Sequence, residues 1–269
     1  MDILLVLIGI MLPYATLLIF FGGLTFKTLS WLHIPVPTKI AVTPAPVTLP
    51  GVLERMSLEF VGFRSLMKGS WKLWLGGWLF HILLGITLLT HLINFFDYGL
   101  WSQIGYGWYQ AAGYAGIAFA TVVAFLFLRR IFHPGVRYVS KPSDYGILLL
   151  LLAIIFLGNY ARTFGDVNVS AVSQYLYGLI TLHPILPPDN GAFLLHLLLA
   201  QLLLIYLPFS KVSHLVGWVL APTRNQRNDS RAVWHRNPWN PAVELEPYAS
   251  YAARYKRELD ELGPGGERR

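Results

Sequence analysis

The chain has 269 residues, of which 55% are hydrophobic and only 13% are charged, whereas about a quarter of the residues of an ordinary soluble domain are charged. This composition excludes a soluble globular protein and predicts an integral membrane protein. The net charge of +7 therefore bears on topology in a bilayer, and we expect no nucleic-acid partner. Because the chain has no cysteine, it cannot ligate an iron–sulfur cluster or a thioether-bound haem, and a metal would have to bind histidine.

Five apolar stretches are long enough to cross a bilayer as helices, which takes about 20 residues each. In chain order they cover residues 3–26, 73–95, 109–128, 145–161 and 191–209. The first stretch has no basic residue before it and follows Asp2, so we interpret it as a retained span rather than a signal peptide. The predicted fold is an all-α, multi-pass integral membrane bundle with five transmembrane helices.

Basic residues predict how this bundle is oriented. From the amino terminus to the tail, the six segments outside the spans hold 0, 6, 0, 4, 1 and 10 of the 21 Lys and Arg residues. By the positive-inside rule the crowded segments are cytoplasmic, which places the amino terminus outside the cytoplasmic (inner) membrane and the carboxyl terminus in the cytoplasm. We expect residues 1–220 to form the five-span domain and residues 221–269 a cytoplasmic tail for partner docking, with a short surface helix over residues 248–262.

The ionisable residues at membrane depth are almost all histidines, and such residues are costly in a bilayer unless they have a function. His81 and His91 lie on the second span. His196 lies near the start of the fifth span, and His214 follows that span beyond Pro208. The two spans run in opposite directions, so His91 pairs with His196 in the outer leaflet. His81 is left to pair with His214 in the inner leaflet.

The two members of the outer pair lie at matching depths in the membrane, whereas those of the inner pair do not. His91 and His196 both lie about 6 to 8 Å from the outer ends of their spans. In straight helices, the 18 residues from His196 to His214 rise about 27 Å, whereas the ten residues from His81 to His91 rise about 15 Å. The inner pair can therefore close only if Pro208 tilts or turns the segment that carries His214.

Two imidazoles that face one another across a helical bundle are the usual axial ligands of a b-type haem. Two pairs therefore predict two haem b groups in a di-haem bundle. Small residues near the pairs would leave room for the macrocycles, namely Gly76, Gly77, Gly85 and Ala200. The alternative is that the histidines only form hydrogen bonds between helices.

These residues resemble the gamma subunit of respiratory nitrate reductase, which has five spans, an outside amino terminus, two histidines ten apart on the second span and two histidines eighteen apart on the fifth. The stretch LIYLPFSKVSHLVGW, which includes His214, is similar to the Pro-Phe-Ser-basic-x-x-His segment of that family. The resemblance covers residues 1–220. It implies that one histidine from each helix holds each haem, and that the chain exchanges electrons with a quinol or menaquinone pool.

The tail departs from the nitrate reductase pattern. Its segments APTRNQRNDSR, HRNPWNP and YASYAARYKRELDELG are similar to the membrane cytochrome b of the sulfite-reductase-associated Dsr electron-transfer complex, a relative of the membrane subunit of heterodisulfide reductase. That branch implies sulfur metabolism, a cytoplasmic iron–sulfur partner resembling the catalytic subunit of heterodisulfide reductase, and further subunits. A respiratory nitrate reductase is the alternative.

The sequence offers only candidates for a quinone pocket. Asp97 could accept a proton, with Tyr98, Trp101 and Tyr109 as aromatic walls. Asp97 could equally be a solvated loop acid or a hydrogen-bonding group at the carboxyl end of a helix. The lysine with which the nitrate enzymes help to bind quinol has no counterpart here, because residues 92–128 contain no basic residue.

Two other function classes fit the same composition. One is a proton-coupled transporter that uses histidines within the membrane, which would predict internal repeats or paired broken helices. The other is a structural anchor for a cytoplasmic enzyme. Both predict a protein without a chromophore, whereas the haem hypothesis makes the chain an electron-transfer subunit of a membrane oxidoreductase.

Overall fold

The computed structural model describes residues 2–34, 45–96, 106–229 and 246–262. All regular structure within these ranges is helical. Contacts divide the chain into two units, Met1–Asn228 and Asp229–Arg269.

The first unit contains five helices that are long and apolar enough to cross a membrane, which confirms the five predicted spans. The first crossing is formed by α1 (Asp2–Val6), the π-helix η1 (Leu7–Met11) and α2 (Leu12–Leu32). The others are α5 (Trp71–Phe96), α7 (Tyr106–Phe132), α9 (Pro142–Thr163) and α11 (Gly191–Tyr206). The first crossing extends six residues beyond its predicted end at residue 26, because Lys27 lies within the helix and bonds to backbone carbonyls of another segment.

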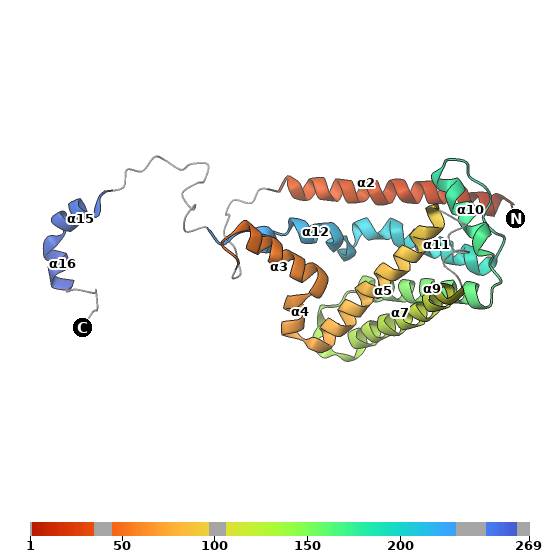
Figure 1. The fold of residues 1–269 in the computed structure, drawn as a ribbon, viewed down its shortest axis with the longest axis horizontal. Helices are drawn as coiled ribbons and strands as arrows, with labels where there is room; N and C mark the ends of the chain where they lie inside the picture. Colours follow the sequence, from red (N-terminus) through yellow and green to blue (C-terminus); the bar gives the residue numbers. More distant parts are fainter. Residues whose placement is uncertain (1, 35–44, 97–105, 230–245, 263–269) are drawn as a thin grey trace. The chain divides into compact units, whose positions relative to one another are not determined.

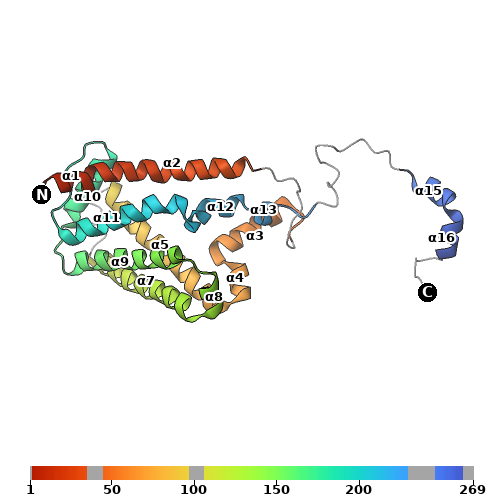
Figure 2. The same cartoon turned by 180° about the vertical axis from the view of Figure 1, so that it is seen from behind.

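The long helices pack as neighbours in a fixed order. α7 packs against α5 and α9, and α11 packs against α9 and α2. Figure 1 shows α2 and α11 side by side, with α5 running obliquely from α4 toward α10, and Figure 2 shows α9 and α7 from the other side. The core between α7 and α9 contains Phe119, Val123, Leu148 and Ile155.

Close approach of α5 to α7 depends on Gly76. A Cβ atom on Gly76 would lie 2.8 Å from the Phe125 ring of α7, which is closer than real Cβ contacts. The small size of Gly76 therefore serves helix packing. A Cβ atom on Gly85 would meet nothing within 4 Å, so that position does leave space beside α5.

The π-helix η1 joins the first crossing to two other elements. The wider turn of a π-helix changes which carbonyls are bonded within the helix, and two carbonyls of η1 accept bonds from elsewhere. Gln201 on α11 donates to the Ile8 carbonyl at 3.0 Å, and the Tyr175 hydroxyl donates to the Gly9 carbonyl at 2.5 Å. Tyr175 lies on α10 (Val169–Ile180) and is fully buried.

The segments between the crossings contain short helices that periodicity did not predict. The proline-rich connection forms α3 (Leu49–Gly62) and α4 (Arg64–Gly69), and Thr48 caps α3 by accepting a bond from the Gly51 amide. The remaining short helices in the described part of the first unit are α8 (Pro134–Val139), α12 (His214–Leu220) and α13 (Pro222–Asn225). Two 3₁₀ turns, η2 (Leu207–Phe209) and η3 (Lys211–Ser213), lie between α11 and α12.

Over residues 248–262, the second unit has two helices in place of the single one expected. These are α15 (Tyr248–Arg254) and α16 (Lys256–Leu262), separated at Tyr255, which leaves helical geometry. Arg254 pairs with Glu246 at 2.8 Å.

Candidate functional site

The outer pair of predicted histidines is brought together. The rings of His91 on α5 and His196 on α11 have centroids 6.1 Å apart and planes 25° apart. The Nδ1 atom of His91 lies 2.7 Å from the Thr87 carbonyl, one turn earlier on the same helix. The Nδ1 atom of His196 lies 2.9 Å from the Ile154 carbonyl of α9, so α9 orients this ring although it contributes no histidine.

Gly158 allows the His196 ring to lie against α9. A Cβ atom on Gly158 would be 2.9 Å from Cε1 and 3.2 Å from Nδ1 of His196. Any larger residue would have to move the ring or the helix. The sequence alone gave no sign of this role, because Gly158 and His196 are 38 residues apart and belong to different crossings.

The inner pair of predicted histidines is also brought together. The centroids of the His81 and His214 rings are 6.1 Å apart, with planes at 72°. The Nδ1 atom of His81 lies 2.7 Å from the Gly77 carbonyl, and that of His214 lies 3.3 Å from the Lys211 carbonyl. Phe63 packs edge-on against His81 at 5.0 Å.

A break after α11 brings His214 to this position. The chain leaves the helix at Pro208, takes an extended conformation at Ser210 and makes a second 3₁₀ turn, so that His214 begins a new helix. The side chain of Lys27 on α2 donates to the carbonyls of Pro208 at 3.1 Å and Ser210 at 3.4 Å. These bonds satisfy carbonyls that the break exposes. The sequence predicted a turn at Pro208, but it did not predict that Lys27 stabilises the turn.

The separation of both ring pairs matches that of two imidazoles on opposite sides of one metal ion. A metal–nitrogen distance of about 2.0 Å, plus about 1.1 Å from nitrogen to ring centre, gives about 6.2 Å between the two ring centres. A direct hydrogen bond between the rings would shorten this distance to about 5 Å. Each Nδ1 faces a backbone carbonyl, which is the usual outer-shell partner of a metal-bound imidazole and leaves Nε2 for the metal. The residues therefore fit bis-imidazole ligation.

The turn that places Phe63 against His81 is fixed by Glu59. Phe63 has a positive φ of 48°, an unusual conformation for a bulky residue. Its amide donates to the Glu59 carbonyl. The Glu59 carboxylate accepts a hydrogen bond from the Ser65 amide and forms an ion pair with Arg224 at 3.3 Å. Burial acts to raise the pKa of Glu59, but the bonds from Ser65 and the charge of Arg224 outweigh it and lower the pKa below its usual range.

A buried acid at the first turn of α9 was not predicted. Asp144 is 9% exposed, and its carboxylate accepts a bond from the Lys141 amide at 2.9 Å and from Lys211 at 2.7 Å. Its position three residues after Lys141 and just after Pro142 is typical of a helix start, but the partnership with Lys211 spans 67 residues. No local pattern could reveal it.

The quinone-pocket candidates receive no structural test. Asp97, Tyr98 and Trp101 lie outside the described residues, and the side chain of Tyr109 on α7 lies outside them as well. Within the described ranges, no group of three or more His, Cys, Asp or Glu side chains could hold a bare metal ion. Within the described residues, the two histidine pairs are the groups whose spacing fits two imidazoles bound to one metal ion.

Comparison with known proteins gives concordant similarities. The sequence model of the nitrate reductase gamma subunit matches residues 54–227. A relative from Archaeoglobus fulgidus, described as an Hdr-like menaquinol oxidoreductase cytochrome b-like subunit, is 34% identical over an alignment that covers 88% of this chain and 84% of the relative. A protein of the same description from Archaeoglobus profundus is 26% identical, covering 93% of this chain and 94% of the relative.

Proposed function

Because this chain belongs to the nitrate reductase gamma subunit family, we propose that it is the membrane cytochrome b subunit of a quinol oxidoreductase. It exchanges electrons between a quinol or menaquinone pool and a cytoplasmic iron–sulfur subunit by way of two b-type haems. The observation that carries this proposal is the 6.1 Å separation in both histidine pairs.

In this proposal His91 and His196 hold the outer haem, and His81 and His214 hold the inner one. A bound haem supplies reversible one-electron chemistry. The chain contributes the hydrogen bonds at Nδ1, where carbonyls of Thr87, Ile154, Gly77 and Lys211 accept from the four rings. Each Nε2 lone pair is thereby left free for a metal. Ten residues of α5 separate the two sites by about 15 Å along that helix.

The polarity of the reaction follows from the proposed topology. With the amino terminus outside, a quinol bound near the outer pair releases protons outside, while electrons leave on the cytoplasmic side. Each elementary charge separated in this way is worth about 2.3 kcal/mol per 100 mV of membrane potential. The proposal also places the protein in the cytoplasmic (inner) membrane. It assigns residues 1–220 to the di-haem domain and residues 221–269 to the docking tail.

The partner we favour is an iron–sulfur subunit resembling the catalytic subunit of heterodisulfide reductase, in a Dsr-type sulfur-metabolism complex with further subunits. The names of the two Archaeoglobus relatives support a menaquinol oxidoreductase of the Hdr-like kind. A respiratory nitrate reductase is the second candidate, because the matching family model is that of its gamma subunit. The subunits that co-purify with the gently solubilised protein distinguish the two.

Haem analysis of the purified wild-type protein and of one histidine variant tests the proposal. We expect two haem b per chain in a pyridine haemochrome assay and a b-type reduced-minus-oxidised spectrum. His91→Ala should lose the outer haem and quinol oxidation while it keeps part of the inner haem. His183→Ala is the matched control, because His183 is exposed in a loop and its ring lies 2.8 Å from the nearby Thr181 carbonyl. A colourless protein, or unchanged haem content in His91→Ala, would contradict the proposal.

A further inference from the structure

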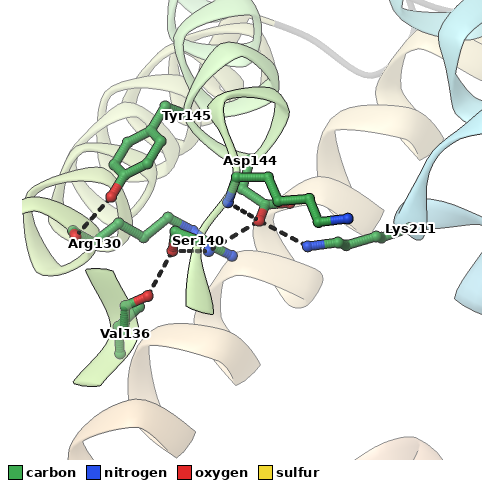
Figure 3. Close-up of polar contacts among 7 residues, drawn as sticks. Arg130, Val136, Ser140, Asp144, Tyr145 and Lys211 are labelled. Atoms are coloured by element: carbon green, nitrogen blue, oxygen red, sulfur yellow. Dashed lines mark hydrogen bonds and ion pairs between the residues drawn. The ribbon is translucent and has the colours of Figure 1, made fainter. Parts of the chain in front are cut away.

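A cluster of charged side chains joins the start of α9 to the break that precedes His214. Figure 3 shows Lys211 and Arg130 directed toward the Asp144 carboxylate. The Lys211 ammonium lies 2.7 Å from Asp144 Oδ2, and the Arg130 guanidinium lies 3.9 Å from the same atom. Arg130 also donates to the Ser140 hydroxyl at 2.9 Å. Asp144 thus has one charged partner near His214 and one that belongs to the junction of α7 with α9.

Lys211 connects this cluster directly to the inner pair. It lies three residues before His214, and its backbone carbonyl is the partner of His214 Nδ1 at 3.3 Å. Two internal bonds hold the neighbouring residues, since the Ser210 side chain accepts from the Val212 amide and Ser213 donates to the Ser210 carbonyl. Lys27 of α2 also donates to the Ser210 carbonyl at 3.4 Å. The ion pair with Asp144 ties the Lys211 side chain to α9.

We propose that Asp144 is a positioning residue for the inner site: its ion pair with Lys211 fixes the orientation of the His214 imidazole. This inference rests on the proposed function, because it assumes that His81 and His214 are the ligands of the inner haem. Asp144 does not contact either ring. It acts through the Lys211 backbone, whose carbonyl holds the imidazole at Nδ1.

His214 needs an additional positioning contact because no continuous helix leads up to it. His81, His91 and His196 project from long helices, whereas His214 follows two 3₁₀ turns and an extended residue. A ligand must be held within about 0.5 Å of its productive geometry by surrounding contacts. An ion pair between a buried carboxylate on α9 and Lys211 supplies this constraint.

Two single variants test the proposal, Asp144→Asn and Lys211→Met. They remove opposite charges, so an effect of electric field alone would shift the reduction potential of the inner haem upward in Asp144→Asn and downward in Lys211→Met. Loss of a shared positioning contact has a different signature. We expect both variants to change the low-spin ferric EPR signal of the inner haem in the same way, with the outer signal unchanged. Combining them should add no further change.

Two controls accompany these variants. Arg130→Gln removes the second charged partner of Asp144 and should leave the inner signal as in wild type, because it spares the contact with Lys211. Lys211→Arg keeps the positive charge and should restore the wild-type signal. The Lys211 side chain is 63% exposed, so Lys211→Met alone decides the matter if Asp144→Asn does not assemble.

Three results would overturn the proposal: a wild-type EPR signal in Lys211→Met, opposite potential shifts without a change in that signal, or equal changes in the inner and outer signals. Failure of the proposed function is recognised separately. It would appear as a wild-type protein with fewer than two haems. A wild-type protein with two haems and unaffected variants would contradict only the role of Asp144.

Discussion

At the scale of single residues, the outer site depends on the absence of a side chain at position 158. Gly158→Ala would place a methyl group 2.9 Å from His196 Cε1, and overpacking of this kind costs about 1–3 kcal/mol. Because α9 also supplies the carbonyl that holds His196, we expect the ring to be displaced and the outer haem to be lost first. Haem content per chain measures this.

Gly146→Ala is the matched control for that variant. Gly146 lies on the same helix, and a Cβ atom there would meet nothing within 4 Å. We expect it to retain both haems and to gain slight stability, since alanine is the better helix former. Equal haem content in the two variants would contradict the proposed contact between α9 and His196.

The ionisation of Glu59 predicts that stability depends on pH near the amino-terminal end of α5. Its pKa in the folded chain lies below the reference value of 4.5, so its stabilising effect is present above pH 4.5 and is lost as the pH falls through the folded pKa. Glu59→Gln should therefore lower stability by about 1 kcal/mol at neutral pH. Thermal unfolding in detergent at pH 7 and pH 4 should show that the difference from wild type shrinks in acid. A difference independent of pH would rule out the carboxylate as its cause.

The histidines could be found from sequence and their supporting residues could not, for one physical reason. A histidine in an apolar span is conspicuous because of its own transfer cost. Gly158, Asp144 and Lys27 matter only through atoms that are distant in sequence. Each of these residue types is common in its local sequence context, and its contact partner comes close only when the helices pack.

At the scale of elements, the spans were predictable because length and apolar composition alone determine them. The five predicted stretches correspond to the five long helices, with ends that differ by up to six residues. The helices α3 and α10 were missed because they lie between spans. They are defined by caps at Thr48 and Asn168 and by packing of α10 against α5 and of α3 against α13 and α4.

The contact of α10 with the π-helix gives a prediction of its own. Tyr175→Phe would remove the donor to the Gly9 carbonyl and should destabilise the protein by about 1 kcal/mol. Burial and the neighbouring Tyr14 raise the pKa of Tyr175, so its hydroxyl remains a donor at physiological pH. Tyr177→Phe on the same helix changes an exposed residue and should have no effect on the melting temperature. Equal shifts in the two variants would contradict a specific role for Tyr175.

At the scale of the whole molecule, the proposed orientation can be tested directly because the chain has no cysteine to remove. Ser170 on α10 and Ser250 on α15 are both exposed. With the amino terminus outside, an impermeant maleimide should label Ser170→Cys in intact cells and Ser250→Cys only after the membrane is opened. The reverse pattern would invert the topology and the polarity of the reaction. Gel shift of the labelled protein measures both.

The order in which the histidines occur along the chain has a consequence for biogenesis. Each pair joins a residue of the second crossing to one at or beyond the fifth, and 133 residues separate His81 from His214. At about 5–20 residues per second, a ribosome takes about 7–27 s to make that interval. Neither site can exist while the early crossings are being inserted. If the pairs hold haem as proposed, its loading follows release of the last crossing from the translocon. A chain that ends before residue 191 would then bind no haem.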